Sequence, residues 1–449
     1  MRPTFLRLGA LVLSMAAAAA AHAAAKFPQE GIWRGEFSVD GDTIPFNFEV
    51  QGKDAAGARF TLLNGSRRDN FVVERVSEDT LSVPMNTYDA ALVFTVVDGK
   101  TLRGEYRDLV PSRNGARNIP FTAEHGKSWR FVEPGKAQPA EVDLSGKWAL
   151  RQSDQARLRD DNENERDNRR NQVGVFKQQG NELTGVIMTA VGDTRELQGI
   201  VQGNRFVLSH FSGPSPRLIK GTVDEDGNLQ GVNGSGIYNV VRFEGRRDPN
   251  AELADPYQLT FLKDGQKTID FTFPDLQGRP VSLRDDKYRG KVVIVEVIGT
   301  WCPNCTDQTY FLAPWFKQNR HRGVEAVAVA FEQEDSFEYF QKTLTKFKQY
   351  FDVQYDIVFG GIADKKVATE KLRGLNYMAA FPTTIIIDRK GEVREIYTGY
   401  TGTVTGEYYE QYVARFNALM DELLAEPDPY ARTAQDQAEA DRAQLVAAH

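Results

Sequence analysis

Two patterns of apolar positions divide the chain. Between Gly31 and Phe243, short runs alternate apolar and polar residues and are interrupted by Gly, Asp and Asn. A period of two residues predicts short β-strands with one buried face, and many such strands in a row predict a sandwich or barrel. Representative runs are residues 33–39, 44–50, 59–63, 92–97 and 205–209.

This β-rich half contains an approximate internal duplication. Residues 31–33 (GIW) recur as residues 146–148 (GKW). We therefore expect two related β units, residues 26–132 and 141–247, each with its tryptophan in the core. The second copy carries an insertion, residues 153–172, with almost no apolar residues and both signs of charge. That composition predicts a solvated loop or an extended hairpin tip, with an electrostatic docking arm as the functional alternative.

Beyond a linker at residues 248–268, strand and helix patterns alternate. Residues 291–298 (KVVIVEVI) form a nearly continuous apolar run, which is typical of a strand buried on both faces. Further strands are expected at residues 271–283 (two strands and a turn), 324–331, 356–359, 385–388 and 393–397. Helices are expected at residues 302–320, 336–350, 363–372 and 407–424. This order predicts a mixed α/β sheet over residues 269–425, with a flexible or helical tail at 426–449.

The composition excludes several classes of protein. The 449 residues are 41% hydrophobic and carry a net charge of −7. This argues against a collagen-like or disordered chain and against nucleic acid as the main partner.

The first 25 residues combine Arg2 and Arg7 with an apolar run and an alanine-rich end, which is the pattern of a cleavable signal peptide. An uncleaved anchor is the alternative. No other stretch is long enough to span a membrane, and no cysteine near the leader could carry a lipid, so we expect a periplasmic or secreted protein.

Cys302 and Cys305 are the only cysteines in the chain. A disulfide between residues so close in sequence would stabilise the fold little. Structural zinc needs four ligands, and the histidines are scattered, so no metal is expected. The pair is therefore interpreted as chemical rather than structural.

The cysteines lie in the sequence Trp301-Cys302-Pro303-Asn304-Cys305, between the buried strand and a helix. Free amides at a helix start stabilise a thiolate on the first cysteine. Cys302 is therefore the expected nucleophile, which forms a mixed disulfide with a partner, and Cys305 the resolving thiol. The aromatic residues that follow are expected on the buried face of this helix: Tyr310, Phe311, Trp315 and Phe316.

Glu296 stands inside the apolar run, six residues before Cys302. An ionised carboxylate is costly in such a setting, so its pKa should be raised and it could accept the Cys305 proton. An edge-strand or water-paired glutamate is the structural alternative. A second element, residues 381–384 (FPTT), precedes the strand at 385–388 and by itself indicates only a turn.

Together these motifs resemble the thioredoxin superfamily, and in particular its TlpA-type thiol-disulfide oxidoreductases, over about residues 270–425. The resemblance implies that Pro382 is a cis-proline facing the disulfide. It also implies that Phe381, Thr383 and Trp301 help bind a substrate chain, with Pro303 and Asn304 supporting the site. Substrates would be cysteine-containing proteins, a membrane electron donor could serve as redox partner, and no cofactor beyond the Cys302–Cys305 disulfide is needed. The N-terminal repeats more distantly resemble lipocalin-like units.

Two departures refine this interpretation. Many TlpA-type proteins carry Glu-x-Pro after the second cysteine, where this chain has Gln308-Thr309-Tyr310, so proton transfer depends on Glu296. Val295 and Gly299 stand where a peroxiredoxin would have its proline and threonine, which argues against peroxidase activity.

The leading hypothesis is an exported thiol-disulfide oxidoreductase. The alternative is an envelope ligand- or partner-binding protein whose redoxin domain senses oxidation. The direction of electron flow is left open by the sequence.

Overall fold

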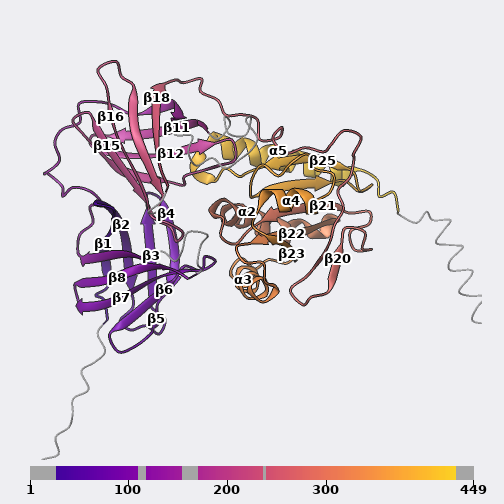
Figure 1. The fold of residues 1–449 in the computed structure, drawn as a ribbon, viewed down its shortest axis with the longest axis horizontal. Coiled ribbons are helices and arrows are strands. Elements are labelled where there is room, and N and C mark those ends of the chain that lie inside the picture. Colours follow the sequence, from indigo (N-terminus) through magenta and orange to yellow (C-terminus); the bar gives the residue numbers. More distant parts are fainter. Residues whose placement is uncertain (1–26, 110–117, 154–169, 236–238, 431–449) are drawn as a thin grey trace, which may run out of the picture.

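The computed structural model describes residues 27–109, 118–153, 170–235 and 239–430. The predicted leader, most of the charged insertion and most of the tail lie outside these residues. Two β-sheets built from the N-terminal half stand beside a C-terminal α/β part (Figure 1). This arrangement confirms the expected fold class.

The first β unit is a nine-stranded antiparallel sheet in which sequence neighbours pair, except for the two edge strands β4 and β5, and β1 also pairs with β9. Alternating apolar residues line its buried face, as in β9, where every second residue is buried. The strands are β1 (Gly31–Val39), β2 (Asp42–Gln51), β3 (Arg59–Asn64), β4 (Arg67–Val72), β5 (Glu74–Arg75), β6 (Thr80–Pro84), β7 (Ala90–Asp98), β8 (Thr101–Asp108) and β9 (Asn118–His125).

The second β unit is also nine-stranded, and it closes on itself because β11 pairs with both β10 and β12. Its first strand again pairs with its second and its last. The strands are β10 (Gly146–Gln152), β11 (Asn171–Gln179), β12 (Glu182–Thr189), β13 (Gly192–Asp193), β14 (Leu197–Gln202), β15 (Arg205–His210), β16 (Arg217–Val223), β17 (Leu229–Ser235) and β18 (Asn239–Arg247).

The duplication seen in the sequence has a common geometry. Trp33 and Trp148 are both buried, and each indole donates a hydrogen bond to the carbonyl four residues earlier, of Gln29 and Leu144 respectively. Both tryptophans therefore pack in the cores of their units, as the sequence predicted.

Phe211 joins the two β units. It follows β15 of the second unit, yet its ring packs among Phe37, Phe46 and Tyr106 of the first, with centroids 4.8 to 5.9 Å apart. Beside it, the buried Arg130 donates hydrogen bonds to the carbonyls of Leu63 in the first unit and Ser209 in the second. The two units thus share part of one core.

The C-terminal part contains the predicted mixed sheet, with strand order β23-β22-β21-β24-β25. β21 is parallel to β22 and antiparallel to β24, so it is the central strand. The small hairpin consists of β19 (Thr272–Pro274) and β20 (Pro280–Ser282), and the sheet of β21 (Val292–Ile298), β22 (Val324–Glu332), β23 (Asp356–Ile362), β24 (Thr383–Ile387) and β25 (Val393–Thr398).

Helices cover both faces of this sheet. Side chains of α2, α3 and α5 pack on the face that carries Ile294 and Ile298, whereas α4 packs on the opposite face. None of the helices in the described ranges is long and apolar enough to cross a membrane. The helices are α2 (Pro303–Asn319), η1 (Arg320–Arg322), α3 (Phe337–Tyr350), α4 (Lys365–Lys371), η2 (Thr403–Thr405) and α5 (Glu407–Ala425).

Because Phe211 is fully buried in a core formed by both units, Phe211→Ala should lower the free energy of unfolding by about 3 to 5 kcal/mol. Phe261→Ala is the matched control, since Phe261 is largely exposed and should cost less than about 1 kcal/mol. Urea denaturation of the full chain measures both values. Equal, small losses for the two variants would show that Phe211 does not stabilise the junction.

Candidate redox site

The two cysteines are held at the junction of β21 and α2. Every residue of β21 is buried, and the chain leaves it through residues 299–301 to begin α2 at Pro303. Proline suits this first helical position because its missing N–H has no intrahelical partner there. Cys302 is the N-cap, and its sulfur accepts a hydrogen bond from the Cys305 amide at 3.2 Å. The helix start therefore presents a donor to Cys302, as its expected role as a thiolate requires.

Both cysteines are free thiols, and they differ in their surroundings. Cys302 is 5% exposed, whereas Cys305 is wholly enclosed. Burial raises the pKa of Cys305 well above its ordinary value, and the neighbouring Cys302 and Glu296 raise it further. A partner can thus reach Cys302 first, while Cys305 needs a base before it can react.

The FPTT element lies against the first cysteine. The Cys302 thiol is 3.4 Å from the Phe381 carbonyl oxygen, to which it can donate, and the Phe381–Pro382 peptide bond is cis. Trp301 packs edge-to-face on Phe381 and donates its indole N–H to the Phe331 carbonyl. Thr383 lies deeper, because it is fully buried and donates to the Ala380 carbonyl within the turn.

Glu296 points to the same face of the sheet as the cysteines. Burial raises its pKa to about 7, and the hydrogen bond that Tyr355 donates to its Oε2 atom at 2.6 Å opposes this rise. Its Oε1 atom is buried and has no hydrogen-bond partner among the described residues. Since β21 is central, the edge-strand interpretation of Glu296 is wrong. A carboxyl group with a pKa near 7 can both take up and release a proton at neutral pH.

A second buried acid, Glu332, supports the loop before the cysteines. Its two carboxylate oxygens accept hydrogen bonds from the Thr300 amide at 2.9 Å and the Thr300 hydroxyl at 2.7 Å. Burial raises its pKa to about 8. The sequence interpretation missed Glu332, although an acid directly after the apolar run at residues 324–331 was a usable signal.

The predictions for α2 hold only in part. Phe316 is buried and Phe311 and Trp315 are half-buried, but Tyr310 is 47% exposed, so its assignment to the core was wrong. Its hydroxyl instead hydrogen-bonds Tyr350 of α3 near the surface. Gln308 is buried and donates to the Thr384 hydroxyl.

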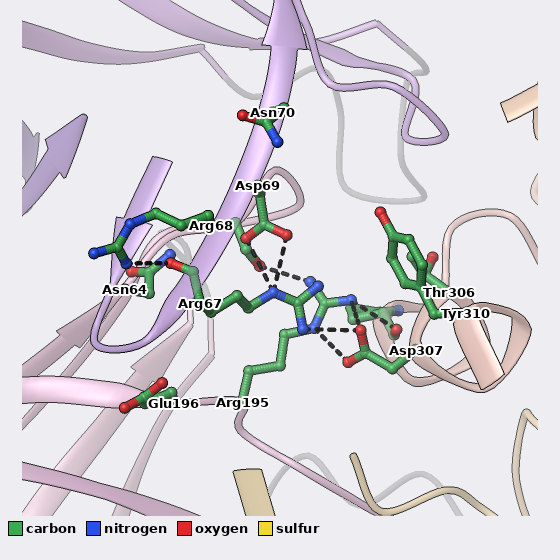
Figure 2. A network of polar contacts seen from close by, with 12 residues as sticks. Asn64, Arg67, Arg68, Asp69, Asn70, Arg195, Glu196, Thr306, Asp307 and Tyr310 are labelled. Atoms are coloured by element: carbon green, nitrogen blue, oxygen red, sulfur yellow. Dashed lines mark hydrogen bonds and ion pairs between the residues drawn. The ribbon is translucent and has the colours of Figure 1, made fainter. Parts of the chain in front are cut away.

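The β units also reach the redox site, although the sequence assigned no site residue to them. Arg67 of β4 and Arg195, which precedes β14, both form ion pairs with Asp307 of α2 (Figure 2). Tyr88, in the β6–β7 connection, donates its hydroxyl to that of Thr306. No local sequence pattern could have shown these contacts, because the partners are 112 to 240 residues apart.

A cysteine pair at the start of a helix, delivered by a buried parallel strand and faced by a proline turn, defines a thioredoxin-like redoxin. Residues 265–396 match the AhpC/TSA family. Thiol-disulfide oxidoreductase ResA of Geobacillus kaustophilus is 31% identical over 156 residues, which cover 35% of this chain and 79% of that protein. The thioredoxin-like protein YneN of Bacillus subtilis is 30% identical over 150 residues, or 33% and 78% of the two chains. The chain belongs to the ResA-like thiol-disulfide oxidoreductases of the thioredoxin superfamily.

Among solved structures, a thioredoxin-family thiol:disulfide interchange protein from Chlorobium tepidum is similar to this chain. The similarity covers 36% of this chain and all of that protein, with 20% sequence identity and a TM-score of 0.27.

The raised pKa of Glu296 predicts a pH-dependent stability. Its ordinary pKa is 4.5 and its folded pKa about 7, so the folded protein holds this proton more tightly than the unfolded chain. The stability that this contributes is present below pH 4.5 and is lost as the pH rises to about 7. Glu296→Gln cannot lose it. Measured by urea denaturation of reduced protein, the variant should therefore gain roughly 3 kcal/mol relative to wild type between pH 4.5 and 7.

Glu410→Gln, the same substitution at an exposed position of α5, is the control for the chemical change itself. Glu332 is present in the wild-type protein and in both variants, so its contribution to the pH dependence of stability cancels when each variant is compared with wild type. A difference between Glu296→Gln and wild type that stays constant from pH 4.5 to 7 would contradict the raised pKa.

Proposed function

We propose that this protein is an exported thiol-disulfide oxidoreductase that exchanges disulfides with protein substrates through Cys302 and Cys305. The observation that carries this proposal is the arrangement of the two thiols. Cys302 caps α2 beside the Phe381 carbonyl, and Cys305 is enclosed on the sheet face that carries Glu296. Family membership supports the reaction class. The predicted leader supports export to the periplasm or the cell exterior.

In the reducing direction, the Cys302 thiolate attacks one sulfur of a substrate disulfide. The substrate S–S bond breaks, a mixed disulfide forms, and the released sulfur takes up a proton. Cys305 then transfers its proton to Glu296 and attacks the Cys302 sulfur. The mixed disulfide breaks, the second substrate sulfur leaves as a thiolate that takes up a proton, and a Cys302–Cys305 disulfide remains. Two electrons pass from the cysteine pair to the substrate. The reverse sequence oxidises a substrate dithiol.

Residues around Cys302 are placed to position a substrate chain. Phe381 and Pro382 form the turn that faces the sulfur, and Trp301 flanks this turn. Trp301 and Phe381 are half-buried and Pro382 is buried beside them, so we assign substrate binding to the partly exposed surface of these aromatic rings next to Cys302. Pro303 and Asn304 support the helix start. A membrane electron donor would return the pair to its reduced form if the protein works as a reductase.

Cys302→Ser should abolish the reduction of insulin in the presence of dithiothreitol, because the attacking thiol is lost. Cys305→Ser should accumulate mixed disulfides, because the resolving thiol is lost. Turbidity measures the first effect, and non-reducing mass spectrometry of trapped complexes measures the second. Full activity of the Cys302→Ser variant would overturn the proposal.

The binding-protein alternative receives less support from the first β unit. Its buried face is filled by aromatic rings, with Phe37 stacked on Phe46 at 4.5 Å and Phe48 on Phe60 at 4.3 Å. Phe211 of the second unit packs into the same core. No observation therefore favours a lipocalin-like ligand in this unit over the redox function.

A further inference from the structure

The second β unit lies directly against the residue pair between the two cysteines. The turn that joins β12 and β13 places Gly192 beside the Asn304 side chain, so closely that a β-carbon at Gly192 would collide with the amide. Next to it, Gly399 packs on the backbone of Val191 so closely that a β-carbon at Gly399 would also collide. The amide of Gly399 in turn donates to the Pro382 carbonyl. This turn therefore borders both the cysteine loop and the proline turn.

Arg195, three residues after Gly192, binds the first turns of α2. Its Nη2 atom donates to the Pro303 carbonyl at 2.8 Å. Its Nε and Nη2 atoms donate to the two carboxylate oxygens of Asp307 at 2.7 and 3.1 Å. One guanidinium thus contacts the residue after Cys302 and a carboxylate one turn further along. Figure 2 shows the second of these contacts, between Arg195 and Asp307. This fork of two parallel bonds is the strong and directional form of an arginine–carboxylate pair.

The guanidinium is fixed from its own side as well. Its Nη1 atom donates to the Ser212 hydroxyl at 2.6 Å, and that hydroxyl also bonds the His210 ring at 2.8 Å. The Arg195 amide donates to Asp193, whose other carboxylate oxygen accepts from the Gly402 amide. Arg195 is buried, and its backbone adopts a left-handed conformation, with φ of 61°. A guanidinium with a hydrogen-bond partner at each of its three nitrogens has little freedom to move away from α2.

The charges around Asp307 are nearly balanced. Arg67 donates to Asp307 at 3.0 Å and also pairs with Asp69 of its own strand. Tyr88 accepts a hydrogen bond from Arg195. Burial raises the pKa of Asp193. It also lowers the pKa of His210 well below 6.5, with Arg195 lowering it further, so His210 is neutral at pH 7.

We propose that Arg195 is a positioning residue of the redox centre: it fixes the start of α2 and cancels the charge of Asp307 near Cys302. Asp307 lies five residues after Cys302, an axial rise of about 8 Å along a helix, which is comparable to the Debye length at physiological ionic strength. An uncompensated carboxylate there would oppose the Cys302 thiolate. The inference deepens the proposed function and rests on it for the role of Cys302.

The test compares two substitutions that should act in opposite directions. In the full chain with Cys305→Ser, so that Cys302 is the only thiol, iodoacetamide alkylation is followed as a function of pH. Arg195→Gln leaves Asp307 poorly neutralised and should shift the alkylation profile to higher pH, with a loss of roughly threefold in rate at pH 6. Asp307→Asn leaves the Arg195 guanidinium without its carboxylate partner, whereas Arg67 keeps Asp69, so this variant should shift the profile to lower pH.

A merely structural role would move both profiles in the same direction or leave both unchanged, and either result would overturn the proposal. Asp307→Asn is nearly isosteric, so it provides the decisive measurement if Arg195→Gln does not fold. Arg217→Gln is the matched control. Arg217 is a half-buried arginine of the same unit, but it bonds Asn233 rather than the redox domain, and its variant should keep the parent profile.

Arg195→Lys separates charge from geometry. Lysine keeps the positive charge but cannot bind Pro303 and Asp307 together. With both cysteines present, this variant should lose about threefold or more in insulin reduction while its alkylation profile, in the Cys305→Ser chain, stays near the parent. Insulin reduction equal to wild type would contradict the positioning role. Alkylation needs no protein substrate, so it tests the charge effect of Arg195 even if the wild-type protein does not reduce insulin. Failure of the wild-type protein to reduce insulin would count against the proposed function alone.

Discussion

The complete burial of β21 is the constraint on which the redox site depends. A strand covered on both faces can carry apolar side chains without cost, and seven successive buried residues give it a fixed position in the sheet. Glu296 is the exception, and its raised pKa is the direct result of this burial. The same rigid strand delivers Cys302 to the start of α2. Nucleophile and buried carboxyl group are therefore fixed relative to each other by one short segment of backbone.

Local patterns in the sequence were sufficient for this central part. The apolar run at residues 291–298, the cysteine pair after it and the acid inside it predicted a buried strand, a helix start and a carboxyl group of raised pKa, and the structure contains all three. The period-two runs likewise predicted the strands of both β units. Tyr310 was misplaced because helical periodicity shows which residues are apolar, not which neighbour covers them. The neighbour of Tyr310 is α3, whose Tyr350 keeps the ring near the surface.

Long-range polar contacts could not be predicted in this way. Arg195 has no distinctive local sequence, and its partner Asp307 is one acid among 62. Only the folded arrangement of the three parts brings them together. Glu332 is intermediate: its place after an apolar strand was visible, but its hydrogen bonds to Thr300 depend on how the loop before the cysteines folds. The reactive residues of the site could thus be predicted from the sequence, whereas most of the contacts that support them could not.

The tight contact between Gly192 and Asn304 has a consequence for the evolution of this chain. The two residues between the cysteines influence the reduction potential of such a pair, and in an isolated redoxin they could change independently of other modules. Here any side chain at position 192 would displace the Asn304 amide, so the space available at position 304 depends on Gly192. Substitutions at the two positions should therefore co-vary among proteins that share this three-part architecture. The β unit would then limit which redox properties are accessible to the enzyme by mutation.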